Sequence, residues 1–312
     1  MSIVISEFMD EAAVDTLRRR FEVRYDPTLV ERRAELLGSL AGASALIVRN
    51  RTQVDEGLLA AAPKLRAVGR LGVGLDNIDV AACRGRGVEV IPATGANALA
   101  VAEYVVATVM VLLRGAYLSS AAVARGQWPR TRLSEGRETA GKILGLVGFG
   151  GIGQLTARLA RSLGMRVMAY DPLLAHDAAA WAETGVERRD LPALLAEADA
   201  VSLHVPLTEE TRGLMDAQRI ARMKPQAVLV NTARGGIVDE AALAAALTDG
   251  RLAGAALDVF EHEPLPAGSP LATAPNLILT PHIGGVTRES NARVSSLIAE
   301  KVGRFLSDAA AL

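Results

Sequence analysis

The chain alternates short β-rich runs with helical patterns from its first residues, and this alternation constrains the fold more than any other feature. It predicts parallel strands joined by helices in a doubly wound α/β arrangement. Half of the residues are hydrophobic but only 4% are aromatic, as expected of buried parallel strands rich in Ala, Val, Leu and Ile. The first expected strands are residues 3–6, 22–25, 45–48, 66–68 and 88–91, with helices at 10–20 and 29–40.

The length of 312 residues exceeds one ordinary hydrophobic core, so we expect two domains. A long helix from Ala98 to about Ala124, with Asn97 as its N-cap, would bridge them. Alternation then restarts, and a last amphipathic helix at 287–306 is expected to return to the first domain. Six further strands are predicted, at residues 143–147, 166–170, 200–205, 227–231, 253–257 and 277–279.

A glycine-rich segment, Gly148-Phe149-Gly150-Gly151-Ile152-Gly153, joins the strand at 143–147 to a helical pattern. In this context the glycines permit a tight turn, close approach of a pyrophosphate and close packing of helix on strand. The next predicted strand ends in Asp171, 18 residues after Gly153, where an acid accepts hydrogen bonds from the adenosine ribose. Its carboxylate repels the 2'-phosphate of NADP, so the sequence predicts NAD as the cofactor.

Charge and cysteine content narrow the partners. The formal net charge is −1, with acids and bases interspersed, so we expect a small-molecule partner and no nucleic acid. A lone cysteine, Cys83, and four scattered histidines make a disulfide or a metal site unexpected. The first residues lack a secretory signal, and the apolar run at 98–113 is shorter than the ~20 residues of a membrane span, so a cytoplasmic protein is expected.

Three chemically complementary side chains follow three successive predicted strands. His204 and His282 both follow strand ends, and His282, beside Gly284 and Gly285, is the better acid/base candidate because an imidazole titrates near neutral pH. Glu263 could fix the tautomer of its ring, and Arg234 could hold a substrate carboxylate with two hydrogen bonds. This set is suited to hydride transfer at an alcohol carbon.

At this point the chain resembles the D-2-hydroxyacid dehydrogenase family over essentially its whole length. The matching segments are residues 69–79, 148–153, 170–172, 231–240, 255–264 and 281–285. The resemblance implies an NAD-binding Rossmann domain at residues 96–285 and a flavodoxin-like, substrate-binding (catalytic) domain at 1–95 with 286–312. It also implies a homodimer to which the long helix after Asn97 contributes.

The resemblance further implies site residues. Arg234 would bind the substrate, His282 would be the acid/base and Glu263 its partner. Backbone around Val73 and Gly74 would meet the substrate carboxylate, and Asn97 would be a further substrate-binding residue. The cofactor contacts would come from Gly148, Gly150, Gly151, Ile152, Gly153, Asp171, His204, Val205, Pro206, Thr232, Ala233, Arg234, Asp258, His282, Gly284 and Gly285.

Within the family the nearest resemblance is to phosphoglycerate dehydrogenases and (S)-sulfolactate dehydrogenases, whose substrates carry a second anion. Arg49, Arg70 and Arg130 occupy matching cationic positions, with Arg130 expected to reach the neighbouring subunit of a dimer. The two substrates have the same spatial arrangement, because sulfur reverses the priority order, so stereochemistry does not separate them. The chain stops just past its last helix, so the regulatory extension of many phosphoglycerate dehydrogenases is not expected.

Other functions stay open. Reduction of glyoxylate or hydroxypyruvate would need no second cation, while phosphite and formate enzymes fit the residues less well. The family also includes corepressors that keep the dinucleotide site and bind partner peptides, so an NAD-sensing binding protein is the alternative from another class.

Overall fold

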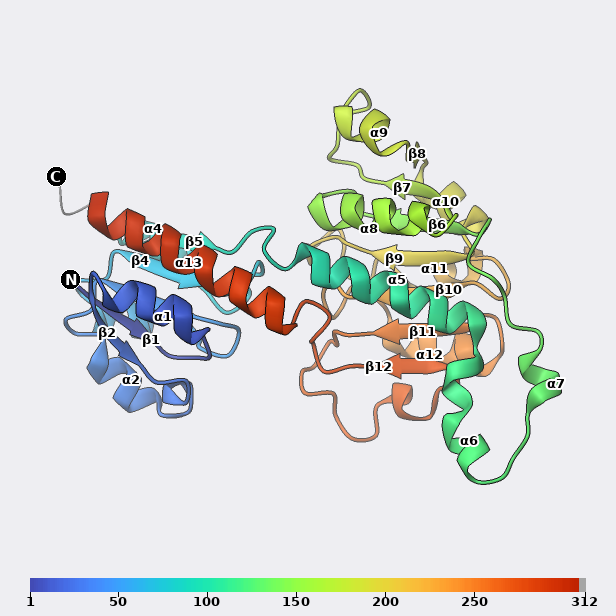
Figure 1. Cartoon of the computed structure of the whole chain (residues 1–312), viewed down its shortest axis with the longest axis horizontal. Helices are drawn as coiled ribbons and strands as arrows, with labels where there is room; N and C mark the ends of the chain where they lie inside the picture. Colours follow the sequence, from blue (N-terminus) through green and yellow to red (C-terminus); the bar gives the residue numbers. More distant parts are fainter. Residues whose placement is uncertain (309–312) are drawn as a thin grey trace. The chain divides into compact units, whose positions relative to one another are not determined.

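The computed structural model describes residues 1–308, which form two compact units, each built around its own parallel sheet (Figure 1). The first unit is Met1–Asn97 with Val286–Leu312, of which the last four residues lie outside the described part, and the second is Ala98–Gly285. The predicted α/β class with two parallel sheets is confirmed.

The first unit has a five-stranded sheet in the order β2-β1-β3-β4-β5. This is the flavodoxin-like order, in which the chain reverses direction across the sheet between β1 and β3. Its strands are β1 (Ser2–Ile5), β2 (Glu22–Tyr25), β3 (Ala45–Val48), β4 (Ala67–Arg70) and β5 (Glu89–Pro92). Its helices are α1 (Glu11–Arg18), the 3-10 turn η1 (Leu29–Glu31), α2 (Arg33–Ser39), α3 (Glu56–Ala61), α4 (Val80–Gly85) and α13 (Arg288–Asp308).

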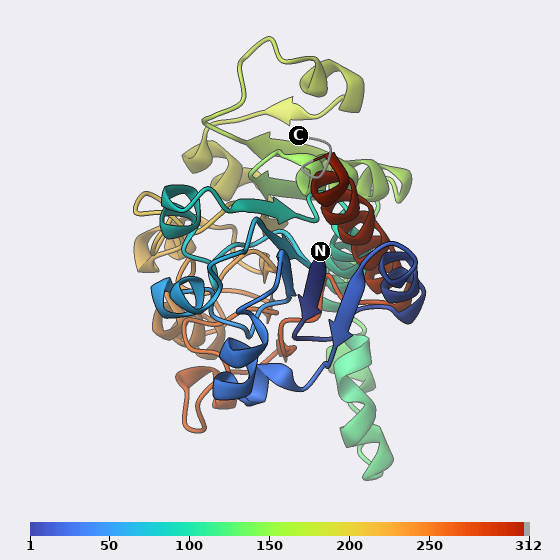
Figure 2. The same ribbon diagram turned by 90° about the vertical axis from the view of Figure 1, so that its left-hand side faces the viewer.

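Helix α13 brings the end of the chain back onto this sheet, beside α1 (Figure 1 and Figure 2). Alternate residues of a strand face opposite sides, so Ile3 and Ile5 pack with α1 and α13 while Val4 packs with α2 and α3. A Cβ added to Gly69 would lie 2.8 Å from Val302, so only a glycine there lets α13 pack this closely. The helix expected at 29–40 is interrupted at Arg32, which leaves η1 and α2 as separate turns.

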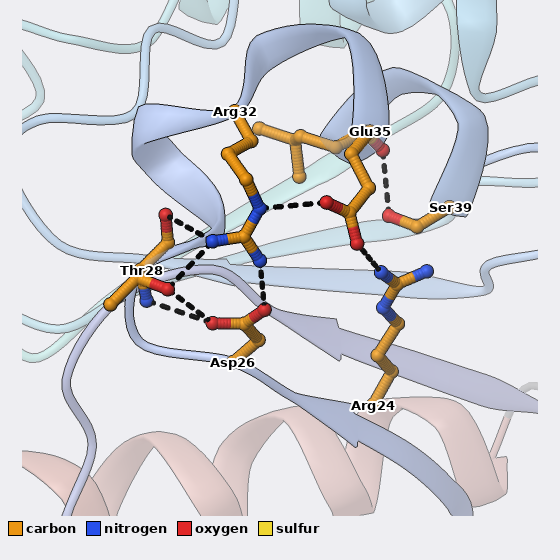
Figure 3. A network of polar contacts seen from close by, with 7 residues as sticks. Arg24, Asp26, Thr28, Arg32, Glu35 and Ser39 are labelled. Carbon is orange, nitrogen blue, oxygen red and sulfur yellow. Dashed lines mark hydrogen bonds and ion pairs between the residues drawn. The ribbon is translucent and has the colours of Figure 1, made fainter.

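A polar network covers the exposed edge at β2 (Figure 3). Arg32 donates to Glu35 (2.7 Å) and Thr28 (2.8 Å) and also pairs with Asp26. Arg24 of β2 reaches the same Glu35, so the network ties the edge strand to α2. The hydrogen bond from Arg32 lowers the pKa of Glu35. Because these groups are solvent-exposed, the network contributes little stability and serves mainly to cover the edge strand.

The second unit has a seven-stranded sheet in the order β12-β11-β10-β9-β6-β7-β8. Its strands are β6 (Ile143–Val147), β7 (Arg166–Tyr170), β8 (Glu187–Arg188), β9 (Ala200–Leu203), β10 (Val228–Asn231), β11 (Gly254–Leu257) and β12 (Leu277–Leu279). The order is that of a dinucleotide-binding fold with one strand added, and the chain reverses between β6 and β9. Six strands were predicted; the missed one, β8, has two charged residues and no apolar run.

Helices cover both faces of the second sheet. They are α5 (Ala98–Arg114), η2 (Ala116–Ser119), α6 (Ser120–Ala124), α7 (Arg130–Leu133), α8 (Gly151–Ser162), α9 (Ala179–Thr184), α10 (Leu191–Glu197), α11 (Ala217–Arg222), α12 (Glu240–Thr248) and η3 (Pro270–Thr273). On one face of the sheet, α5 and α8 pack against strand residues such as Leu144 and Val230. On the other face, α10, α11 and α12 pack against strand residues such as Val201 and Leu229.

The prediction of a single helix from Ala98 to Ala124 is wrong. Gly115 adopts a left-handed conformation (φ 67°), and the chain bends by 67° between α5 and the η2–α6 segment. In the described part of the chain no one helix has the length and apolar content of a membrane span. The helices on the two sides of this bend reach that length and apolar content only when they are counted together.

Candidate active site

The carboxyl ends of six strands in the second unit lie in one row. Parallel pairing sets Tyr170, Val147, Leu203, Asn231, Leu257 and Leu279 opposite one another across β7, β6, β9, β10, β11 and β12. Ligands bind at this edge of such sheets, where the order reverses. Within six residues after the row come Asp171, Gly148 to Gly153, His204 to Pro206, Thr232 to Arg234, Asp258, Glu263, and His282 to Gly285. Register alone therefore gathers the predicted cofactor residues of this unit.

The glycine-rich turn occupies the point of reversal. Gly148 has a positive φ of 97°, and a Cβ there would lie 2.6 Å from the carbonyl oxygen of His204, so the loops after β6 and β9 are in direct contact. Beyond it, α8 begins at Gly151, and no neighbouring atom lies within 4 Å of a Cβ built at Gly150 or Gly151. The first N–H groups of a helix lack intrahelical acceptors and attract phosphate. The turn therefore fits a pyrophosphate.

Asp171 lies directly beside this turn. Its Oδ2 accepts from the backbone N–H of Phe149 (2.8 Å) and its Oδ1 from that of Leu173 (2.9 Å). Oδ1 also accepts from the N–H of Leu174 (3.2 Å). Since each carboxylate oxygen has two lone pairs, Oδ2 is the oxygen that keeps capacity for a ribose hydroxyl. The carboxylate is thus fixed at the place predicted for the adenosine ribose.

The loop after β10 carries an unused buried hydroxyl. Asn231 holds the loop by accepting from the N–H of Ala233 (3.0 Å) and donating to the carbonyl of Arg234 (2.9 Å). Between them, Oγ1 of Thr232 is buried and has no hydrogen-bond partner among the described residues. Since an orphaned buried hydroxyl is unfavourable, Thr232 fits a polar group of the cofactor.

Arg234 and Glu263 lie on loops that touch. A Cβ on Gly235 would overlap the carbonyl oxygen of Phe260, so only glycine allows this approach. Glu263 is oriented in turn by the backbone N–H of Phe260, which donates to its Oε1 at 3.1 Å. Arg234 donates to the carbonyl of Ala233 at 2.6 Å and is partly buried. The contact at Gly235 thus sets the spacing between the cationic and acidic side chains.

His282 and Glu263 form the pair that the sequence suggested. Nδ1 of His282 lies 2.8 Å from Oε2 of Glu263, and the imidazole remains 42% exposed. A carboxylate accepts only, so Nδ1 carries the proton and Nε2 of a neutral ring has a free lone pair. The arrangement leaves Nε2 able to accept a proton from a substrate.

His204 is electrostatically different from His282. Burial lowers the pKa of His204 to about 4, and its Nε2 lies 3.0 Å from Oγ of Ser202. At neutral pH its ring is therefore uncharged and a poor proton acceptor. Of the two strand-end histidines, His282 is the one suited to acid/base chemistry.

The predicted anion-binding residues of the first unit lie at strand ends: Arg49 directly follows β3, and Arg70 is the last residue of β4. Arg49 is partly buried, donates to Oδ1 of Asn291 (2.8 Å) and lies 5.8 Å from the ring centre of Phe8. Arg70 is 9% exposed, and its guanidinium lies against Gly72, the residue before Val73 and Gly74.

Of the other two predicted substrate residues, Asn97 ends the first segment of the first unit and Arg130 lies in the second unit. Asn97 precedes α5, but its buried Oδ1 bonds no described residue, so the expected N-cap bond is absent. Arg130 begins α7, and no hydrogen bond or ion pair among the described residues links its side chain to the carboxyl-edge row.

Sequence reasoning missed three polar residues of these sites. Asn291, on α13, holds Arg49, while Tyr104 and Thr280 bond each other at 2.7 Å beside the loop of His282. Thr280 directly precedes Pro281-His282 and was visible as a polar residue at a strand end. Asn291 and Tyr104 gave no sequence signal, because their partners lie 242 and 176 residues away.

The lowered pKa of His204 predicts how the free energy of unfolding changes with pH. The folded protein binds this proton less tightly than the unfolded chain, whose histidine titrates near 6.5. The contribution to the free energy of unfolding is therefore full above pH 6.5 and declines as the pH falls towards 4, by about 3 kcal/mol. Denaturant unfolding of the parent and of His204→Gln is measured from pH 7.5 to 4.5. As the pH falls over this range, the parent should lose about 2 to 3 kcal/mol more stability than the variant. An equal loss in the two proteins would contradict the assignment.

Comparisons with known proteins agree with this geometry. Residues 106–284 match the family model described as D-isomer specific 2-hydroxyacid dehydrogenase, NAD binding domain. An (S)-sulfolactate dehydrogenase of Chromohalobacter salexigens is 60% identical over 97% of this chain and 98% of its own length. A D-3-phosphoglycerate dehydrogenase of Mycobacterium bovis is 42% identical over 98% of this chain, which spans 58% of that longer protein.

A solved structure of a Thermus thermophilus protein has a TM-score of 0.88 at 36% identity and covers 99% of this chain, which covers 97% of it. The predicted family, its NAD cofactor and its reaction class are thereby confirmed. This chain belongs to the D-isomer specific 2-hydroxyacid dehydrogenases, NAD-binding oxidoreductases that act on the CH–OH group of their donors.

Proposed function

We propose that this dehydrogenase interconverts a 2-hydroxy acid bearing a second, strongly acidic group, of the (S)-3-sulfolactate type, with its 2-keto acid. The observation that carries the reaction is the contact between His282 and Glu263. The second anion is supported by Arg49, and the sulfonate by the 60% identity to a protein of that name.

In the proposed reaction, Arg234 binds the carboxylate of the substrate and orients C2. Nε2 of His282 takes the hydroxyl proton while the C–O bond becomes a carbonyl, and Glu263 stabilises the resulting imidazolium. NAD, when bound, supplies the acceptor for the hydride that leaves C2. The same groups run the reaction backwards, because the protonated His282 returns its proton to the carbonyl oxygen. Gly148 to Gly153, Asp171 and Thr232 are the residues proposed to hold the cofactor.

Arg49 is suited to the second anion by its surroundings. Its hydrogen bond goes to a neutral amide, and the nearby carboxylate of Glu7 is occupied by the backbone N–H groups of Arg49, Arg51 and Thr52 at 2.9–3.1 Å. Burial lowers the pKa of Arg49, although Glu7 opposes this change. A partly desolvated guanidinium gains more from an anionic ligand than one already paired with a carboxylate.

A homodimer belongs to the same proposal. The arm, residues 116–133, which includes η2, α6 and α7, exposes four large apolar side chains: Tyr117 (67% exposed), Leu118 (44%), Val123 (43%) and Trp128 (77%). Exposed apolar groups of this kind mark protein contacts, and Arg130 follows directly after them. We expect the protein to sediment as a dimer at micromolar concentration. Sedimentation as a monomer would exclude the dimer.

The proposal also includes a cytoplasmic location, where NAD is available.

Replacing His282 tests the acid/base assignment. In His282→Ala the value of kcat should fall by about 10^2 to 10^4, because general acid–base catalysis typically contributes that factor. The affinity for NAD, followed by fluorescence titration, should stay within about threefold, since Asp171 and the glycine turn are untouched. His262→Ala, which removes an exposed histidine from the neighbouring loop, is the matched control. Near-normal turnover of His282→Ala would remove His282 from the mechanism.

The substrate is tested by a panel. NADH formation is measured with (S)-3-sulfolactate, D-3-phosphoglycerate, D-lactate and D-glycerate, for the parent, Arg49→Ala and Arg51→Ala. We expect sulfolactate to give the highest kcat/KM, and Arg49→Ala to lower it by about tenfold or more, as removal of a charged hydrogen bond does. Arg51, whose side chain is 59% exposed and pairs with Glu31, is the control from the same loop and should matter little.

Other results would redirect the proposal. Equal activity on all four acids would favour a small-acid enzyme, and faster reduction of glyoxylate or hydroxypyruvate by NADH would identify it. Tight NAD binding without turnover of any acid would favour an NAD-sensing binding protein.

A further inference from the structure

The loop that carries His282 is held by one buried carboxylate. Asp258, at the end of β11, is 2% exposed. Its backbone carbonyl accepts from the N–H of His282 (2.8 Å), its Oδ1 from Ile283 (2.8 Å) and its Oδ2 from Gly284 (2.7 Å). Three consecutive amides thus converge on one residue. They hold His282 at a positive φ of 55°, a conformation that a residue with a side chain rarely adopts.

Two partly buried hydroxyl groups extend this arrangement from Asp258 to α5. Oγ1 of Thr280 donates to Oδ1 of Asp258 at 2.6 Å, and Oγ1 of Thr280 lies 2.7 Å from the hydroxyl of Tyr104. A carboxylate only accepts, so the single proton of Thr280 is committed to Asp258. The proton between the other two groups must therefore come from Tyr104. The direction of both hydrogen bonds is therefore fixed: Tyr104 donates to Thr280, and Thr280 donates to Asp258.

Tyr104 is well placed to anchor this chain. It lies on α5, whose residues Val101 and Val105 are in the core of the second unit. Burial raises the pKa of Tyr104, so the phenol keeps the proton that it donates. A Cβ built on Gly284 would lie 2.9 Å from Oδ2 of Asp258 and 3.4 Å from Cγ of Tyr104. The ring of Tyr104 therefore lies close to Gly284 at the end of the loop, while its hydroxyl bonds Thr280 at the start of the loop.

We propose that Tyr104 is a positioning residue for catalysis: through Thr280 and Asp258, its hydroxyl holds the 281–284 loop so that His282 stays aligned with Glu263 and with the substrate. Tyr104 touches neither substrate nor reacting atoms. The inference rests on the proposed acid/base role of His282. It adds a partly buried pair of hydroxyl groups, one on α5 and one directly after β12, to the residues on which the rate depends.

The test separates the hydroxyl from the ring. Tyr104→Phe removes only the donor, Thr280→Val removes the middle of the chain, and Thr280→Ser keeps it. For the first two we expect kcat to fall by about tenfold, as loss of a hydrogen bond serving a charged group does. KM for the acid and the affinity for NAD should stay within about threefold. Thr280→Ser should restore most of kcat. Thr184→Val, which removes another buried hydroxyl of the same unit, should leave kcat unchanged.

A second readout does not depend on turnover. Amide hydrogen exchange of residues 281–285, followed by mass spectrometry, should be faster in Tyr104→Phe and Thr280→Val than in the parent and in Thr184→Val. Faster exchange with a lowered kcat supports the proposal. Unchanged kcat in both variants overturns it, as does a loss confined to NAD affinity, or a failure of Thr280→Ser to restore activity.

The two proposals fail in distinguishable ways. If the parent protein oxidises none of the panel acids, the proposed function fails while the exchange experiment still reports on the loop. If the parent is active and the exchange of residues 281–285 and kcat do not respond to Tyr104→Phe, only the positioning role fails.

Discussion

The in-register pairing of the parallel strands in the second unit is the constraint on which its chemistry depends. Because six strands end in one row, residues from positions 148 to 282 reach the same edge without any need for long loops. Each loop then needs only a local device to aim its side chain. Asn231 caps one loop, Asp258 holds another, and glycines at 148 and 235 allow loops to touch. Backbone hydrogen bonds thus provide the coarse placement and buried polar side chains the fine placement.

Electrostatic environment separates groups of the same type. His204 and His282 both follow strands of the same sheet, yet burial keeps the first neutral while the second stays exposed beside a carboxylate. Asp171 and Asp258 likewise both follow strands. Asp171 faces the glycine turn, whereas Asp258 is taken up by three donors from the loop after β12. Residue type and position in the chain do not distinguish these roles, but burial and partners do.

The sequence was sufficient for the architecture and for the residues that end strands. Apolar alternation predicted both sheets, and strand-end positions identified Arg234, Glu263 and His282, of which His282 and Glu263 lie in hydrogen-bond contact. It failed where the signal was not local. The strand β8 is two charged residues long, and the break at Gly115 follows from a backbone conformation that glycine permits but does not require. Tyr104 and Asn291 find their partners only through tertiary packing, so no spacing rule could reveal them.

The environment of Glu7 bears on the anion-binding role proposed for Arg49. Its carboxylate is used up by three backbone N–H groups and is 4% exposed, so it organises the loop of Arg49 without forming an ion pair with the guanidinium. The field of Arg49 therefore extends into the solvent, where mobile ions screen it over about 10 Å at moderate salt. If Arg49 binds the second anion as proposed, its attraction for a doubly charged acid depends on ionic strength. With the role proposed for Arg49, a rise in salt concentration lowers the preference of the enzyme for doubly charged over singly charged acids.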